Sequence, residues 1–462
     1  MGFPFFRKTL LLCKMGRKTI IRLATKGFVT IAAGLVVWGA VGFFNPRTES
    51  YGSDFTPPKN EPASFRISGF FSDNNEFSYL EKRMDRFLRR ENLVGASVAV
   101  AKDGKLIYAK GFGYADKENE TSVEPYNLFR VASVSKLITA AGIMKLCEQE
   151  ALNLEDKVFG PNGILNDSIY LEYRDKRVED ITVLQLLNHS GGWTSRWGDQ
   201  MFMPTIIARN LNKSLPVNES DIIRFVLKKR LHFIPGEASY YSNLGYMILG
   251  QVVEKIAQMS YEDYIQTHVL YPLGIFDMQV GGSYLYERAA LEVKYYEPEE
   301  TFYVDDHNGS GEQVLRSYGG NDMHTLGAAG GWIASSTDLM KLMLALDGFS
   351  TVPDILSASS INRMVEPVIP GYSPLGWRRI KKDGWYRTGT LAGTSALMVR
   401  HDNGISYVVL VNTGSWKGPQ LANDIHKEME RGLKSIKEWP DYNLYELDNS
   451  MAVIRNRPQI IY

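Results

Sequence analysis

The stretch ASVAVAKDGKLIYAKG, residues 96–111, contains the first recognisable element of the fold. Small and apolar residues alternate with others from Ala96 to Lys102 and again from Lys105 to Gly111, and Asp103-Gly104 between the two runs is typical of a tight turn. Two alternating runs joined by such a dipeptide predict a β-hairpin. This hairpin would place two neighbouring strands near the beginning of the globular part of the chain.

Three more strand-like runs lie near the other end of the chain, at Trp385–Gly389, Thr394–Arg400 and Ile405–Val411, and they predict an antiparallel meander. The sequence between the two ends has mostly helical periodicity. Strands from both chain ends with helices between them indicate an α+β fold, in which a mostly antiparallel sheet is flanked by helices and packs on a helical subdomain. The predicted helices are Leu137–Leu146, Ile222–Leu231, Gly245–Ile256, Tyr261–Val269 and Thr337–Leu346.

The composition is that of a globular protein. The 462 residues include 52 Lys+Arg and 52 Asp+Glu, with 44% hydrophobic and 23% charged residues, which excludes a disordered, collagen-like or multi-span membrane protein. Because the charges balance and no run of aromatic residues interleaved with Lys or Arg was identified in the globular part, nucleic-acid binding is not expected. No second linker or repeat interrupts residues 76–435, which we therefore interpret as one domain.

The N-terminal region has the pattern of a membrane anchor. Residues 1–27 contain seven basic residues and no acidic one, and an uncharged apolar run follows up to Phe44. We interpret residues 28–44 as a transmembrane helix, with the basic segment in the cytoplasm and the remainder extracytoplasmic (periplasmic). Two alternatives stay open, a cleaved signal peptide that would leave a secreted protein and a buried core helix. The run is longer than a usual signal-peptide core, and bulky Phe43 and Phe44 stand where a cleavage site needs small residues.

Residues 45–75 are rich in Pro, Ser, Asn and Gly and have no period, so they are interpreted as a flexible linker. The tail, residues 436–462, has weak patterning and is left unassigned.

The first candidate catalytic group is Ser133-Val134-Ser135-Lys136, which an apolar run follows at once. If a helix begins near Ser133, Lys136 lies on the same face and its amine can approach the serine hydroxyl. A helix that is apolar almost all round is buried, and burial lowers the pKa of a lysine so that it can act as a base. In the alternative interpretation, Ser133 caps a helix and Lys136 lies on its surface.

The second candidate group is Tyr241-Ser242-Asn243, in a loop before another apolar helix. This spacing can bring a phenol and a carboxamide into one cleft, where the phenol relays a proton and the amide holds both the lysine and a substrate carbonyl. Alternatively, the aromatic residues of this loop only cover the core.

The third group is Arg387-Thr388-Gly389-Thr390 on the first strand of the meander. Gly389 would let a substrate backbone approach the strand edge closely, and the N–H of Thr390 could join that of Ser133 as an oxyanion donor. Arg387 could hold a carboxylate in a bidentate grip. The alternative is an exposed turn.

The order and spacing of SVSK, YSN and RTG resemble the serine β-lactamase and penicillin-binding protein superfamily, and most closely its branch of class C β-lactamases, D-alanyl-D-alanine carboxypeptidases and carboxylesterases. The resemblance covers residues 76–430. Further segments that resemble this branch are GASVAVAKDGKLIYAKGFGYAD at 95–116, LLNHSGGW at 186–193, YPLGIFDM at 271–278, GAAGGWIASSTDLMKLM at 327–343 and GTSALMVRHDNGISYVVLVN at 393–412.

The resemblance implies that Ser133 is the nucleophile, Lys136 its activator and Tyr241 the general base that later protonates the leaving group. It also implies that Asn243 positions the lysine and the substrate. Thr388 and Gly389 would line the site, and the backbone N–H groups of Ser133 and Thr390 would form the oxyanion hole. One residue departs from the family pattern: Arg387 stands where the family usually has Lys or His, and arginine does not give up a proton in proteins.

The resemblance implies a membrane-anchored serine hydrolase that forms an acyl-enzyme on an amide, ester or β-lactam, including cell-wall peptides. Arg387 favours substrates with an anionic end. Two alternatives are a penicillin- or peptide-binding sensor without turnover and a purely structural envelope protein. No metal or cofactor is expected, because no H-E-x-x-H, C-x-x-C or phosphate-binding glycine motif is present. We expect His189 in NHSGG to be structural, holding a loop through hydrogen bonds.

Overall fold

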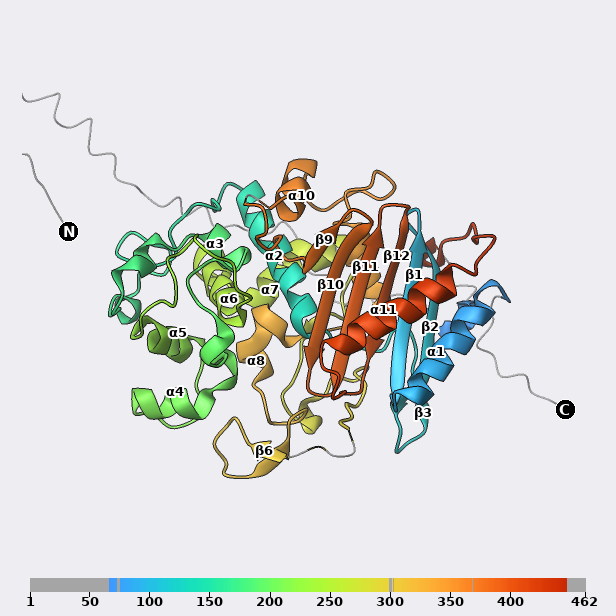
Figure 1. The fold of residues 1–462 in the computed structure, drawn as a ribbon, viewed down its shortest axis with the longest axis horizontal. Helices are drawn as coiled ribbons and strands as arrows, with labels where there is room; N and C mark the ends of the chain where they lie inside the picture. Colours follow the sequence, from blue (N-terminus) through green and yellow to red (C-terminus); the bar gives the residue numbers. More distant parts are fainter. Residues whose placement is uncertain (1–65, 73–74, 299–300, 302, 368, 447–462) are drawn as a thin grey trace, which may run out of the picture. The chain divides into compact units, whose positions relative to one another are not determined.

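The fold is built around a seven-stranded antiparallel sheet in the order β3-β2-β1-β12-β11-β10-β9 (Figure 1). The computed structural model describes residues 66–72, 75–298, 301, 303–367 and 369–446. The strands of the large sheet are β1 (Gly95–Lys102), β2 (Lys105–Asp116), β3 (Thr121–Ser122), β9 (Arg379–Lys381), β10 (Gly384–Leu391), β11 (Thr394–His401) and β12 (Ile405–Val411).

The two chain ends meet in the middle of this sheet, where β1 pairs with β12 so that Ala96 lies opposite Val411. The predicted hairpin is confirmed as β1 and β2, and both residues of its turn have positive φ, 50° at Asp103 and 80° at Gly104. Such a turn matches the right-handed twist of the strands it joins. The predicted meander is confirmed as β10, β11 and β12. The α+β class with a sheet from both chain ends is therefore confirmed.

Helices cover both faces of the sheet. On one face lie α1 (Ser78–Arg90) and α11 (Gln420–Leu433), as Figure 1 shows, and on the other face the core includes α2 (Ser135–Glu148) and α9 (Ser336–Leu344). Consecutive residues of β1 point into opposite cores, Val98 into the first and Ala99 into the second. Because both faces are covered, this strand is apolar throughout nearly all its length.

A helical region lies beside the sheet (Figure 1), as the sequence predicts. The helix α5 (Glu219–Leu227) ends four residues before the predicted Leu231, whose N–H is instead donated to the Asp175 carboxylate. The remaining helices are α3 (Val183–Leu187), α4 (Pro204–Leu211), α5 (Glu219–Leu227), α6 (Asn243–Ala257), α7 (Tyr261–Ile265), α8 (Met323–Leu326) and α10 (Ala358–Val365). Two small sheets complete the domain: β4 (Phe129–Arg130), β8 (Trp332–Ala334) and β5 (Gln279–Val280) in that order, and β6 (Tyr303–Asp305) with β7 (Gln313–Leu315).

The packed domain extends beyond both expected boundaries. Within the expected linker, Ile67 is buried and the Ser72 hydroxyl accepts the N–H of Ala109 on β2. Within the unassigned tail, Leu444 is buried and Tyr445 donates to the carbonyl of Thr337. Short polar segments of this kind carry no periodicity, so the sequence did not distinguish them from linkers.

None of the helices in the described part of the chain is long and apolar enough to cross a membrane. The transmembrane helix expected over residues 28–44 lies outside the described residues.

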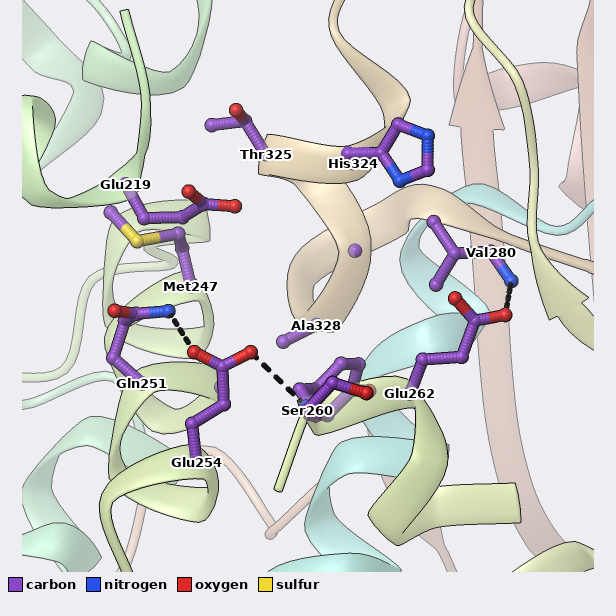
Figure 2. Close-up of a pocket in the computed structure, with 13 residues that line it drawn as sticks. Glu219, Met247, Gln251, Glu254, Ser260, Glu262, Val280, His324, Thr325 and Ala328 are labelled. Atoms are coloured by element: carbon purple, nitrogen blue, oxygen red, sulfur yellow. Dashed lines mark hydrogen bonds between the residues drawn. The ribbon is translucent and has the colours of Figure 1, made fainter. Parts of the chain in front are cut away.

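A pocket of about 190 Å³ lies between α6, α7 and the α8 segment (Figure 2). Its carboxylates join neighbouring elements: Glu254 accepts hydrogen bonds from Gln251 and from the N–H of Tyr261, and Glu262 accepts one from the N–H of Val280. Figure 2 shows no nucleophile paired with a base among the residues drawn in it.

Replacing Phe87 by Ala should lower the free energy of unfolding by about 3–5 kcal/mol, because this side chain is fully buried between α1 and the sheet. Denaturant unfolding measures the loss, and Lys82→Ala on the exposed side of the same helix is the control. Equal stability of the two variants would show that α1 does not cover the core as described.

Candidate active site

A pocket of about 280 Å³ lies at the edge of the sheet, and the three predicted motifs meet in it. They come from the turn before α2, from the start of α6 and from β10. Residues more than 100 positions apart in the chain therefore share one cavity. The pocket is lined by Ala132, Ser133, Phe202, Tyr241, Asn243, Leu326, Ala329, Gly330, Arg378, Thr388, Thr390, Leu391 and Pro419.

Ser133 lies in the tight 3-10 turn Ala132–Val134, and α2 begins only at Ser135. Ala132 has a φ of 47°, which is unfavourable for a residue with a side chain. The hydroxyl of Ser135 donates to the carbonyl of Ala132 at 2.7 Å and holds this turn in place. The turn leaves Ser133 partly accessible at the pocket, while both neighbouring residues are buried.

Lys136 has no exposed surface, although it is charged in water at neutral pH. Its Nζ lies 3.4 Å from Ser133 Oγ and donates to Asn243 Oδ1 at 2.7 Å and to the carbonyl of Ala329. Burial lowers the pKa of this amine and the charge of Arg387 adds to the effect, while Tyr241 partly opposes it. The predicted buried lysine is thus confirmed, and it is hydrogen-bonded rather than isolated.

The Tyr241 hydroxyl donates to Ser133 Oγ at 2.6 Å. Burial alone would raise the pKa of this phenol, but the charges of Lys136 and Arg387 and the hydrogen bond with Ser133 outweigh it and lower the pKa to about 8. The alternative in which this tyrosine only covers the core does not explain its hydrogen bond to Ser133.

Asn243 is the first residue of α6, and the hydroxyl of Ser242 caps this helix by accepting the N–H of Gly245. While the Asn243 oxygen faces Lys136, its Nδ2 donates to the carboxylate of Asp199 at 2.6 Å. Asp199 was missed in the sequence, because an aspartate after Gly198 is typical of an ordinary loop turn. No spacing linked it to the other motifs.

Arg387, which was expected to hold a substrate carboxylate, is buried outside the pocket lining. Its side chain is 1% exposed and does not line the pocket, and both Nε and Nη2 donate to the backbone carbonyl of Ser133. This arrangement also differs from the exposed turn of the alternative interpretation. Two of its donors are thus directed at the protein backbone, and its charge lowers the pKa values of Lys136 and Tyr241.

The cation that does line the pocket is Arg378, which the sequence analysis missed. It is exposed, and its guanidinium carbon lies 4.9 Å from the centre of the Tyr241 ring. Its backbone N–H donates to the carbonyl of Tyr386, which fixes it beside β10. A surface arginine next to Arg379 carries no sequence signal that separates it from solvent-facing neighbours.

Gly389 lets β10 lie directly against the turn that carries Ser133. A Cβ atom at this position would stand 2.1 Å from the carbonyl oxygen of Val131 and 3.1 Å from the nitrogen of Ser133. The close approach expected at Gly389 is therefore to the protein's own backbone. It brings the strand segment with Thr388 and Thr390 next to Ser133, where the resemblance places an oxyanion hole.

His189 is buried beside the site. Its Nδ1 accepts the N–H of Ser242, and its ring packs 4.7 Å from that of Tyr241 and 5.2 Å from that of Tyr246. Burial lowers its pKa well below the usual value, and the nearby charge of Lys136 adds to this, so the ring is neutral. The expected role in holding a loop is confirmed by this hydrogen bond.

The chain is similar to known proteins both in sequence and in fold. Among curated proteins, the chain is 30% identical over 205 residues to Protein flp of Staphylococcus aureus strain MW2 and 31% identical over 195 residues to Penicillin-binding protein 4* of Bacillus subtilis strain 168. These matches cover 43% and 42% of this chain but only 37% and 39% of the two relatives. The chain thus spans well under half the length of the curated relatives it matches.

Among solved structures, D-amino acid amidase from Ochrobactrum anthropi SV3 shares the fold, with a TM-score of 0.62 and 22% identity over 79% of this chain and 99% of that one. Residues 80–428 match the Beta-lactamase family. This match includes all three motifs and spans most of the described domain. The chain therefore belongs to the Beta-lactamase family, within the superfamily of serine β-lactamases and penicillin-binding proteins.

Proposed function

We propose that this protein is a membrane-anchored, extracytoplasmic serine hydrolase that transfers an acyl group from an amide, ester or β-lactam to water through an acyl-enzyme on Ser133. One observation carries the proposal: Ser133 Oγ lies within hydrogen-bond reach of both a buried lysine, Lys136, and a phenol with a lowered pKa, Tyr241. Anchoring rests on the apolar sequence of residues 28–44 after the basic N-terminus.

In the first half of the reaction, Tyr241 is the base and Lys136 supports it. The Ser133 proton passes to Tyr241 as Oγ attacks the substrate carbonyl, and the new oxyanion accepts hydrogen bonds from the N–H groups of Ser133 and Thr390. Tyr241 then protonates the leaving group as its bond to carbon breaks. Lys136 and Arg387 favour the phenolate by their positive charge, and arginine needs no proton exchange for this role.

The second half regenerates the serine. Water attacks the acyl carbon, its proton passes to Tyr241, and the bond between carbon and Ser133 Oγ breaks as that oxygen takes the proton back. A sensor would complete only the first half. Arg387 supports this second candidate, because its guanidinium fixes the backbone of the nucleophile itself and its charge cannot be removed. The two candidates differ in whether the acyl group is released from Ser133: a hydrolase releases it and a sensor does not.

We infer that the preferred substrates carry an anionic end, with Arg378 as its partner. Arg378 lines the same pocket as Ser133 and Thr388, and no ion pair to its guanidinium is found among the described residues. A guanidinium offers paired donors to a carboxylate. Small amides and cell-wall peptides both fit this class, in keeping with the names of the amidase and penicillin-binding relatives.

The full-length protein should be labelled by a fluorescent penicillin or a fluorophosphonate, and Ser133→Ala should abolish the labelling, because Ser133 is the proposed nucleophile. Gel fluorescence measures the label and its decay over time. Decay with repeated product release indicates a hydrolase, whereas one stable equivalent indicates a sensor. A folded protein that neither probe labels would disprove the proposed function.

The labelling rate should rise about tenfold per pH unit at low pH and level off above pH 8, because the phenolate of Tyr241 is the base and its pKa is about 8. Tyr241→Phe should lower the rate at pH 8 by about 100-fold or more and remove this rise. The control is Tyr240→Phe, whose ring is largely exposed. An unchanged pH profile in Tyr241→Phe would refute the role of the phenol.

Arg378→Ala should lower kcat/KM about tenfold for a nitrophenyl ester with a terminal carboxylate and much less for its neutral analogue, because a charge-assisted hydrogen bond is lost. Arg379→Ala, at the neighbouring exposed position on β9, serves as the matched control. Equal losses on the charged and neutral esters would rule out Arg378 as the anion-binding group.

A further inference from the structure

Asp199 is joined to the catalytic lysine by one intervening side chain. Its Oδ2 accepts a hydrogen bond from Asn243 Nδ2 at 2.6 Å, and Asn243 Oδ1 accepts one from Lys136 Nζ at 2.7 Å. The other oxygen of Asp199 accepts the N–H of Met201 at 3.1 Å and so caps the short turn Gln200–Phe202. The carboxylate therefore uses one oxygen on the loop and the other on the active site.

The hydrogen-bonding chemistry of Lys136 and Asp199 fixes which end of the Asn243 amide faces each of them. A carboxamide can present either its oxygen or its NH₂ group to Lys136, but only the oxygen can accept a hydrogen bond from the amine. A carboxylate accepts hydrogen bonds and donates none, so it can pair only with the NH₂ end of Asn243. Asp199 thereby selects the one orientation of the amide that serves Lys136.

Resting on the proposed acyl transfer at Ser133, we propose that Asp199 is a positioning residue of this site: it orients the Asn243 carboxamide toward Lys136 and places the negative charge that balances the cations around the amine. Asp199 does not itself line the pocket, so it acts through Asn243, which does.

The charges facing Lys136 come from several elements. Arg387 on β10 disfavours the charged amine, and Arg378 adds a second cation above the Tyr241 ring, while Tyr241 and Asp199 favour the charged amine. His189 is neutral, and from the π-helical turn Gly327–Gly331 only a backbone carbonyl reaches the amine. Tyr246 presents its ring at 5.5 Å from Nζ. Asp199 is thus the carboxylate within a cluster otherwise made of cations, phenols and neutral groups.

Two substitutions of Asp199 distinguish its role in orienting Asn243 from its role in capping the turn Gln200–Phe202. Asp199→Ser keeps a hydroxyl that can cap the N–H of Met201 but is too short to reach Asn243. Asp199→Asn offers one acceptor in place of two, so it can serve Met201 or Asn243 but not both with the correct amide orientation. Asp322→Ser, at the cap of α8, is the matched control, since Asp322 also caps a helix but has no contact with Asn243.

The rate of fluorophosphonate labelling of full-length protein should fall about 10- to 100-fold at its plateau in both Asp199 variants and stay at the wild-type rate in Asp322→Ser. The rising limb of the pH profile should move to lower pH in both variants, because the lost negative charge had opposed formation of the Tyr241 phenolate. In an Asn243→Ala background, Asp199→Asn should cause no further loss at the plateau. Wild-type rates and pH profiles in both variants would show that Asp199 only caps the turn and would overturn the proposal.

A second measurement does not depend on Ser133 being reactive. Titration of the Lys136 amine by NMR, with its signal assigned by loss in Lys136→Arg, should give a lower pKa in Asp199→Asn than in the wild type. An unchanged Lys136 pKa overturns the charge-balancing role even if no probe labels Ser133. Absence of labelling in the wild type with a shifted Lys136 pKa would instead refute the proposed function and leave the role of Asp199 supported.

Discussion

The complete burial of the Lys136 amine is the constraint on which the site depends. An ammonium group loses its hydration when it is buried, so it needs acceptors and its pKa falls. The fold supplies acceptors from separate places, the Asn243 side chain at the start of α6 and the backbone carbonyl of Ala329 in a π-helical turn. Each of these elements must be in place before the amine can be buried. The burial that costs the amine its hydration is also the main cause of its lowered pKa.

Positive charge at the site is divided between two arginines with different surroundings. Arg387 is buried and bound to the backbone of the nucleophile, so it fixes the position of Ser133 and lowers the pKa of Tyr241. Arg378 is exposed at the pocket and remains open to a substrate. A family position that usually holds Lys or His has thus become a permanent structural charge. In the proposed mechanism, this charge supports proton transfer by Tyr241.

Much of the fold could be predicted from the sequence, because hydrophobic period and turn residues are local signals. The hairpin around Asp103-Gly104, the meander that ends at Val411 and the apolar helix after Lys136 all have such signals. The helices α1 and α11 have strongly polar outer faces and were missed. In the site, Ser133, Lys136, Tyr241 and Asn243 could be found by spacing. Asp199 and Arg378 could not, because only the tertiary fold brings ordinary loop residues to the motifs.

The pairing of β1 with β12 also determines when the site can exist. Partners such as Ala96 and Val411 are more than 300 residues apart, and contacts between distant residues pay the entropy of closing a long loop before they gain any stability. The turn that holds Ser133 rests against β10, which is itself fixed in the sheet by β11 and β12. A nascent or C-terminally shortened chain therefore contains Ser133 but lacks the strands that position it. On the proposed function, reactivity would require β12 to be in place at the centre of the sheet.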